Sequence, residues 1–276
     1  EPNDVVRFTA TGPGGGVVLT GPDGLPIEVG GDAGPKVYAG VAITVAAYDA
    51  PAAVKAASHY VCTGTNDQVP IEEALAALPA GGGVVLLSAG TFSAHVRMRI
   101  ANTQLMGVGY GTIVKTPPAA ELTNNSTPIC VLADDCYVGN LTVDGNKAEQ
   151  TVSTALIGNV RDFDGVASYA NRVLVEKVRG QNCHGHTFVT WNDPFLAEDV
   201  LAGPRSGNVF QNCLVINRGE RNSMDFASTD PHLGALLEDN INTGNVMRYN
   251  TLLNGANIVI HTGWDTDVIG NRLVGG

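Results

Sequence analysis

The stretch CYVGNLTVDGN, from Cys136 to Asn146, decides the fold because variants of it return along the rest of the chain. The copies read RVLVEKVRGQN from Arg172, NVFQNCLVINR from Asn208, NVMRYNTLLNG from Asn245 and, in shorter form, DVIGNRLVGG from Asp267. Their central polar positions are Asn140, Glu176, Asn212, Asn250 and Asn271, at intervals of 36, 36, 38 and 21 residues. Such a period, with strands inside each unit, predicts stacked coils that hydrogen-bond to their neighbours.

The shortest interval, 21 residues, has the length of one bare coil. The longer intervals therefore carry about fifteen extra residues each, which we expect to form loops on the side of the solenoid. Loops on a rigid scaffold of this kind usually carry the function. Asparagine suits the recurring turns because it tolerates left-handed backbone and can hydrogen-bond to the coil above.

The segment from Tyr60 to Val114 combines an Asp-containing turn, a helix pattern, the glycine run GGG, a strand ending in GTF and the sequence LMGVGYGT. This order resembles the opening of right-handed parallel β-helix proteins of the pectate-lyase-like superfamily, and NLTVDGN from Asn140 continues the resemblance. It covers roughly residues 60 to 276 and implies an all-β fold, a right-handed parallel β-helix with a short N-terminal helical cap. The same architecture occurs in pectate and alginate lyases, glycoside hydrolases, C5-epimerases, phage tailspikes and adhesins, so it does not fix a reaction.

Three regions follow from this reading. Residues 1–47 form a small β-rich N-terminal appendage, cut by Gly-Pro and Asp-Gly turns, that we interpret as an attachment segment. Residues 48–80 form the helical cap, in which Ile71, Leu75 and Leu78 share one helix face. Residues 81–276 form the β-helix, which stops in mid-pattern at NRLVGG, so we expect a continuing chain or a second chain to cover that end.

Composition excludes several classes of partner. The net charge of -11 and the pI near 4.8 argue against nucleic acid, because binding phosphate needs clustered lysine and arginine. No apolar run approaches the roughly 18 residues of a membrane span. The five cysteines lack a CxxC pair, which favours buried free thiols over a disulfide framework or a zinc site.

Three later segments, TFVTWND, MDFASTD and VIHTGWD, each end in aspartate, at Asp193, Asp230 and Asp265. If their strands stack in register, these carboxylates lie about 4.8 Å apart on neighbouring coils. Three outcomes stay open: one carboxyl is protonated and serves as a general acid beside a base, the three bind calcium, or they splay into solvent.

The tripeptide Asp230-Pro231-His232 resembles the Asp-Pro-His of alginate C5-epimerases and related β-helix lyases. That resemblance implies that Asp230 and His232 move the proton at C5 of a uronate, with Arg218, Arg221 or Arg205 neutralising the carboxylate. Trp191 and Trp264 stand one or two residues before an aspartate, which suits a sugar-binding groove, although packing beneath a loop remains the alternative for each.

The sequence therefore predicts a polysaccharide-binding β-helix that degrades or modifies a glycan as a lyase, hydrolase or C5-epimerase of tailspike type. The catalytic cluster would be Asp193, Asp230, His232 and Asp265. The alternative is a non-catalytic virion tail protein or secreted adhesin. The resemblance further implies an extracellular or virion-associated protein, a homo-oligomer such as a trimer, and contacts to virion or cell-surface proteins through the appendage.

Overall fold

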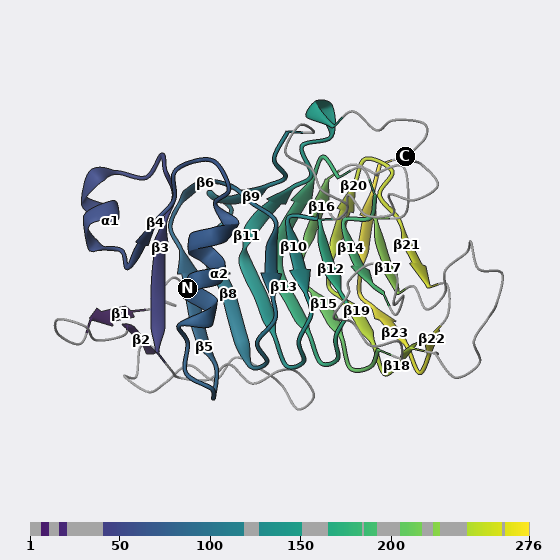
Figure 1. The fold of residues 1–276 in the computed structure, drawn as a ribbon. Helices are drawn as coiled ribbons and strands as arrows, with labels where there is room; N and C mark the ends of the chain where they lie inside the picture. The colour runs from purple at the N-terminus through teal and green to yellow at the C-terminus, as the bar shows by residue number, and fades with distance from the viewer. Residues whose placement is uncertain are drawn as a thin grey trace.

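The computed structural model describes residues 7–10, 17–20, 41–118, 127–150, 165–183, 185–191, 205–216, 223–226, 242–260 and 263–275. Figure 1 shows a stack of coils that runs from the N-terminal helices at the left to the C-terminal strands at the right. Within each coil the chain passes through short strands that pair with the equivalent strands of the coils before and after. All pairings between these coil strands are parallel, so the expected all-β parallel β-helix is confirmed.

The larger sheet has 14 strands and two limbs that meet at a bend. Its first limb holds β3 (Ala42–Ala46), β5 (Gly83–Leu87), β8 (Thr103–Gly107), β15 (Val209–Gln211), β19 (Val246–Arg248) and β23 (Asp267–Ile269), with β4 (Tyr60–Val61) beside β3. Its second limb holds β6 (Gly90–Ser93), β9 (Thr112–Lys115), β16 (Leu214–Ile216), β20 (Thr251–Leu253) and β24 (Arg272–Val274). The longer strands β11 (Tyr137–Asp144) and β13 (Leu174–Gln181) run through both limbs.

A second sheet, the six-stranded sheet, closes each coil. It contains β7 (Val96–Met98), β10 (Ile129–Val131), β12 (Val166–Ser168), β14 (Phe188–Thr190), β17 (Met224–Phe226) and β21 (Ile258–Ile260). Two further pairs lie outside these sheets: the parallel pair β18 (Asn242–Thr243) and β22 (Gly263–Trp264), and the antiparallel hairpin β1 (Arg7–Ala10) and β2 (Val17–Thr20).

The bend between the two limbs is made by one left-handed residue in each coil. These residues are Asn140, Lys177, Asn212, Tyr249 and Gly270, with φ between 52° and 59°. The sequence alignment had placed Glu176, Asn250 and Asn271 in this column, and the pairing register moves each of them by one residue. Lys177 and Tyr249 adopt the left-handed backbone conformation, which is strained for residues other than glycine. They do so because the strands before and after each of them are paired with the neighbouring coils, and this pairing fixes where the chain must bend.

Asparagines next to these bends tie the coils together from inside. Asn250, 1% exposed, accepts a hydrogen bond from Cys213 N (2.9 Å) through Oδ1 and donates from Nδ2 to Phe210 O (2.9 Å). Asn271 Oδ1 in turn accepts from Asn250 N at 2.9 Å. The amides thus satisfy backbone groups that would otherwise be buried without partners.

The helical cap closes the N-terminal end of the core. Helix α2 (Gln68–Ala76) buries Ile71 and Leu75, and Leu78 lies just beyond it, so the predicted apolar face is confirmed. The shorter helix α1 (Ala52–Ala57) buries no residue. Strand β3 lies inside the range expected for the appendage, yet it pairs with β5, so the β-helix begins at residue 42.

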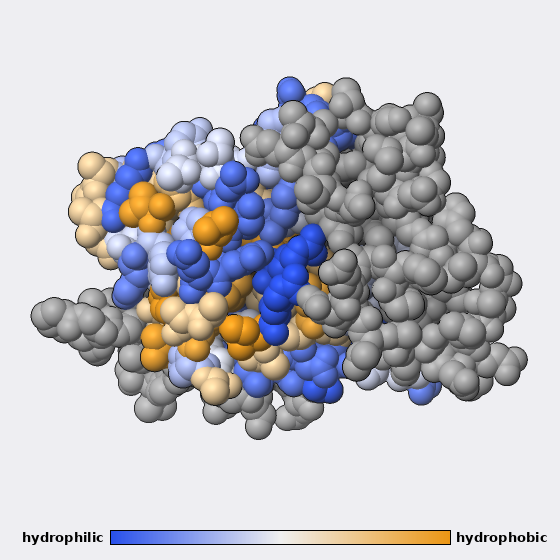
Figure 2. Space-filling model, in the orientation of Figure 1, coloured by the Kyte–Doolittle hydropathy of each residue, from blue (hydrophilic) through white to orange (hydrophobic). Residues whose placement is uncertain are grey.

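The surface around these helices mixes apolar and hydrophilic residues rather than presenting one apolar patch (Figure 2). Val54, Val61 and Val69 are exposed there. All five cysteines are buried and free, as the sequence predicted. No helix among the described residues is long and apolar enough to cross a bilayer.

Candidate functional site

The outer face of the six-stranded sheet carries a buried histidine–aspartate pair. Alternate residues of its strands, such as Phe188 and Met224, point into the main core. The residues between them point outward, and the register aligns Cys130, Ala167, Val189 and Asp225 in one outward row. The row begins with Arg97 on β7. Asp225 is thus a carboxylate that follows three small apolar side chains in the row, and it is 0% exposed.

Asp225 is paired with a histidine from the preceding coil. His186 Nε2 lies 3.3 Å from Asp225 Oδ2, and the two side chains are 3% and 0% exposed. His186 also meets the Trp191 ring edge-on, with ring centroids 5.3 Å apart and an interplanar angle of 77°. A carboxylate beside an imidazole favours the protonated imidazole and orients the ring.

Arg205 adds a cation behind this pair. It is 8% exposed, and its Nε donates to Trp191 O at 3.4 Å. Burial lowers the pKa of its guanidinium, while the carboxylate of Asp134 acts in the opposite direction. Trp191 is 3% exposed, and its indole packs against His186. This contact is of the packing kind, one of the two roles that the sequence analysis considered for Trp191.

Most of the predicted site residues lie outside the described residues. Asp193, Asp230, His232, Arg218 and Arg221 belong to this group. Their roles therefore stay predictions. In sequence they lie close to the His186–Asp225 pair, because Asp193 follows Trp191 by two residues and Asp230 follows β17 by four.

The register corrects the predicted aspartate column. The alignment by terminal aspartates placed Thr190 opposite Ala227 and Thr262, whereas the strands pair Thr190 with Phe226 and Phe226 with Ile260. Asp193 and Asp230 themselves lie outside the described residues. Asp265 is separated from β21 by the short strand β22, which pairs with β18.

Asp265 belongs to a different column. The offset that pairs Thr243 with Trp264 and Val246 with Asp267 places Asp265 opposite Gly244. Both residues are left-handed, with φ of 52° and 62°, and Asp265 is exposed. Trp264 contributes its backbone to β22. Across the described ranges, no group of three or more histidine, cysteine or acidic side chains is placed to hold a metal ion.

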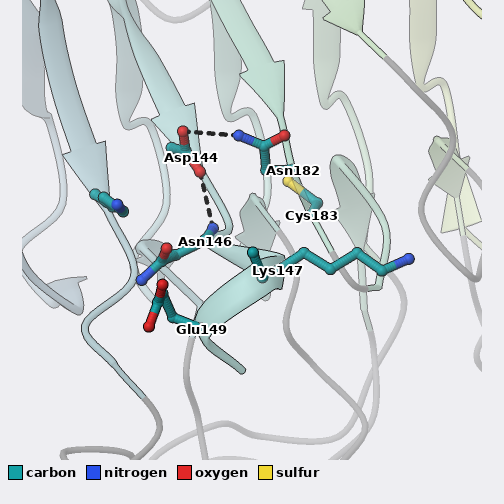
Figure 3. A pocket seen from close by; sticks show the side chains of 8 residues that line it. Asp144, Asn146, Lys147, Glu149, Asn182 and Cys183 are labelled. Carbon is teal, nitrogen blue, oxygen red and sulfur yellow. Dashed lines mark hydrogen bonds between the residues drawn. The ribbon is translucent and has the colours of Figure 1, made fainter. Parts of the chain in front are cut away.

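A second feature is a pocket of about 690 Å³ beside the short helix η2 (Lys147–Glu149), here named the η2 pocket. Its polar lining comes from Lys115, Asp144, Asn146, Lys147, Glu149 and Asn182, and Cys183 also contributes. Figure 3 shows Asp144 between Asn146 and Asn182, to which it is hydrogen-bonded. The sequence analysis did not predict this pocket, because its residues come from three separate coils.

The sequence did contain a signal for the missed His186–Asp225 pair. Asp225 stands in MDF, the middle of an apolar strand, where a carboxylate is costly to bury without a partner. His186 stands in CHGH, which lacks the spacing of a zinc site. Only the register of β14 and β17 brings the two residues together.

Comparison with known proteins gives the fold. No family model and no curated protein matches the chain. A candidate glycosyl hydrolase from Parabacteroides merdae superposes with a TM-score of 0.58 at 14% identity, covering 76% of this chain and 91% of that one.

Two further structures superpose less well. The A-module of a mannuronan C-5 epimerase from Azotobacter vinelandii gives a TM-score of 0.46 at 20% identity, covering 76% of this chain and 53% of that one. The ORF18 protein of Geobacillus virus E2 gives 0.40 at 15% identity, covering 71% and 47%. Together with the parallel pairing of successive coils, the fold comparison leads to one conclusion: the chain is a parallel β-helix protein.

Proposed function

We propose that this protein binds a polysaccharide along the outer face of the six-stranded sheet and acts on it as a glycan-modifying enzyme. The observation that carries the proposal is the buried His186–Asp225 pair, in which Asp225 follows Cys130, Ala167 and Val189 in its row. A structural solenoid gains little from burying an acid where the two preceding coils place alanine and valine, because buried polar groups are costly unless their hydrogen bonds are fully satisfied.

The chemistry follows from the orientation of the pair. An imidazole oriented by a carboxylate, as His186 is by Asp225 at 3.3 Å, has the arrangement of a general base. Such a base suits removal of the proton beside a uronate carboxylate, which begins both β-elimination and C5 epimerisation. It also suits activation of water for hydrolysis.

The predicted residues extend this site. Asp230 and His232 would act with the pair on the sugar, as their resemblance to the Asp-Pro-His tripeptide implies. Asp193 would add a second carboxylate, and Arg218, Arg221 and Arg205 would offset the charge of an acidic glycan. A calcium ion at Asp193 and Asp230 would also offset the charge of an acidic glycan, since oxygen ligands suit this cation; Asp265 belongs to a different column and is left out of this site.

The test is an activity panel on the whole chain. Uronate and neutral polysaccharides are incubated with the protein, with calcium or with EDTA, and assayed for new reducing ends, for the ultraviolet absorbance of unsaturated uronates and for epimerised product. We expect one of these signals on at least one glycan, and its loss in His186→Gln. Binding without any of the three signals across the panel would instead indicate the receptor-binding virion protein or adhesin.

A further inference from the structure

We infer that the η2 pocket is a second carbohydrate site, which binds an uncharged sugar unit of the same glycan. This inference rests on the proposed function for the identity of the ligand as a glycan. The site itself is argued from the geometry and charge of the described residues.

The floor of the pocket is fixed by hydrogen bonds between coils. Asp144 is 8% exposed, and its Oδ1 accepts from Asn146 N at 2.8 Å. Its Oδ2 accepts from Gln181 Nε2 at 2.7 Å and from Asn182 Nδ2 at 3.0 Å. Because these bonds exist before a ligand arrives, binding requires little ordering of the floor.

The walls are tied down as well. Asn146 Nδ2 donates to Thr116 O at 3.0 Å, and Gln150 Nε2 donates to Pro117 O at 2.9 Å. The other amide atom, Gln150 Oε1, is buried and has no hydrogen-bond partner among the described residues. Gln150 does not line the pocket, so its bond to Pro117 O holds the end of η2 in place and offers no group to a ligand.

The charges of the lining indicate the class of ligand. Lys115 and Lys147 balance Asp144 and Glu149, although the chain as a whole carries -11. This pocket therefore gathers two of the chain's five lysines, which are Lys36, Lys55, Lys115, Lys147 and Lys177. A balanced set of ammonium, carboxylate and amide groups offers both donors and acceptors and favours neither an anionic nor a cationic ligand. Sugar hydroxyls match such a lining, since each hydroxyl donates and accepts a hydrogen bond.

The size and place of the pocket fit the same ligand. Its volume of about 690 Å³ lies in the range of small-molecule sites. Asn182 and Cys183 stand just before β14, and His186 follows them on the same segment. The pocket lining and His186 thus belong to one segment of the chain, and the pocket would anchor a sugar unit of a glycan whose reacting unit lies toward His186.

The test is calorimetric titration of the whole chain with neutral and uronate oligosaccharides from the glycan panel. The variant is the double substitution Lys147→Ala with Glu149→Ala, which removes two exposed lining groups and leaves the net charge unchanged. The matched control is Lys55→Ala with Glu73→Ala, a charge-neutral pair on α1 and α2. Circular dichroism and the thermal midpoint check that both variants fold.

We expect a neutral oligosaccharide to bind with little dependence on salt, and the Lys147/Glu149 variant to lose at least about tenfold in affinity while the control is unchanged. The inference is overturned if no neutral oligosaccharide binds, if only uronates bind, or if the variant binds like the wild type. Loss of binding in the variant without turnover of any glycan would retain the pocket and reject the enzyme. Turnover of a glycan together with unchanged binding in the variant would retain the enzyme and reject the pocket as a carbohydrate site.

Discussion

His186 Nε2 and Asp225 Oδ2 lie 3.3 Å apart on neighbouring coils of the β-helix, both buried beside Trp191. The contact exists because β14 and β17 pair in a register that sets Val189 against Asp225. A shift of one residue in that register would turn Asp225 into the core and separate the pair. The proposed acid–base centre is thus a consequence of how the coils stack.

The first prediction concerns this pair. Asp225→Asn keeps the shape of the side chain but removes the charge that holds the imidazole, so we expect the rate to fall by about 10² to 10⁴. The measurement is the initial rate on the active glycan across a pH series. The control is Asp267→Asn, at an exposed aspartate in β23, which should leave the rate unchanged. A rate equal to that of the wild type in Asp225→Asn would remove Asp225 from the mechanism.

The second prediction concerns the inner asparagines. Asn250→Ala leaves Cys213 N and Phe210 O buried without their partner, so the free energy of unfolding should fall by about 2–4 kcal/mol. Asn212→Gly is the control, because the residue is exposed and glycine keeps its left-handed backbone of φ 53°. Urea unfolding measures both variants, and equal losses would show that the buried amide has no special role.

The third prediction concerns pH. The guanidinium of Arg172 donates to Asp135 Oδ1 at 2.7 Å and holds the pKa of that carboxyl below its ordinary value. A lowered pKa in the folded state means that the pair stabilises the protein at neutral pH and that this stabilisation disappears as the pH falls through that value.

Arg172→Gln should therefore destabilise the chain at pH 7 by less than about 1 kcal/mol, since half of the arginine side chain is exposed. The difference from the wild type should begin to shrink below about pH 4, the ordinary range of the carboxyl, and vanish once the pH is below its lowered pKa in the folded state. Urea unfolding midpoints at several pH values test this, and urea is chosen because it does not screen charges. A difference that persists unchanged at acid pH would contradict the ion-pair explanation.

The fourth prediction concerns the thiols. Burial raises the pKa of Cys62 and of Cys213 to about 12, and raises that of Cys136 as well. Since the thiolate is the reactive form, the native protein at pH 8 should react only slowly with a disulfide reagent. Unfolding in guanidinium should expose all five thiols at once. A thiol that reacts rapidly in the folded protein would show that one of these sites opens locally.

Part of the candidate site could be predicted from the sequence. The segments TFVTWND and MDFASTD contain β14 and β17, so the predicted Asp193 and Asp230 follow these strands in sequence, and their roles stay predictions. The aspartate column was misaligned, because β22 is too short to be recognised by periodicity and shifts Asp265 into another column. The η2 pocket could not be predicted, since Lys115, Asp144 and Asn182 meet only through strand pairing.

The sequence by itself determined the stacked coils, the buried face of α2, the buried cysteines and the recurrence of one bend per coil. These features follow from local composition and from a repeat that persists along the chain. The tertiary structure alone decided that Lys177 and Tyr249, rather than Glu176 and Asn250, take the left-handed bend, and that Asp225 meets His186. The reason is that the coils differ in length, so contacts between them are set by the backbone hydrogen bonds that fix the register.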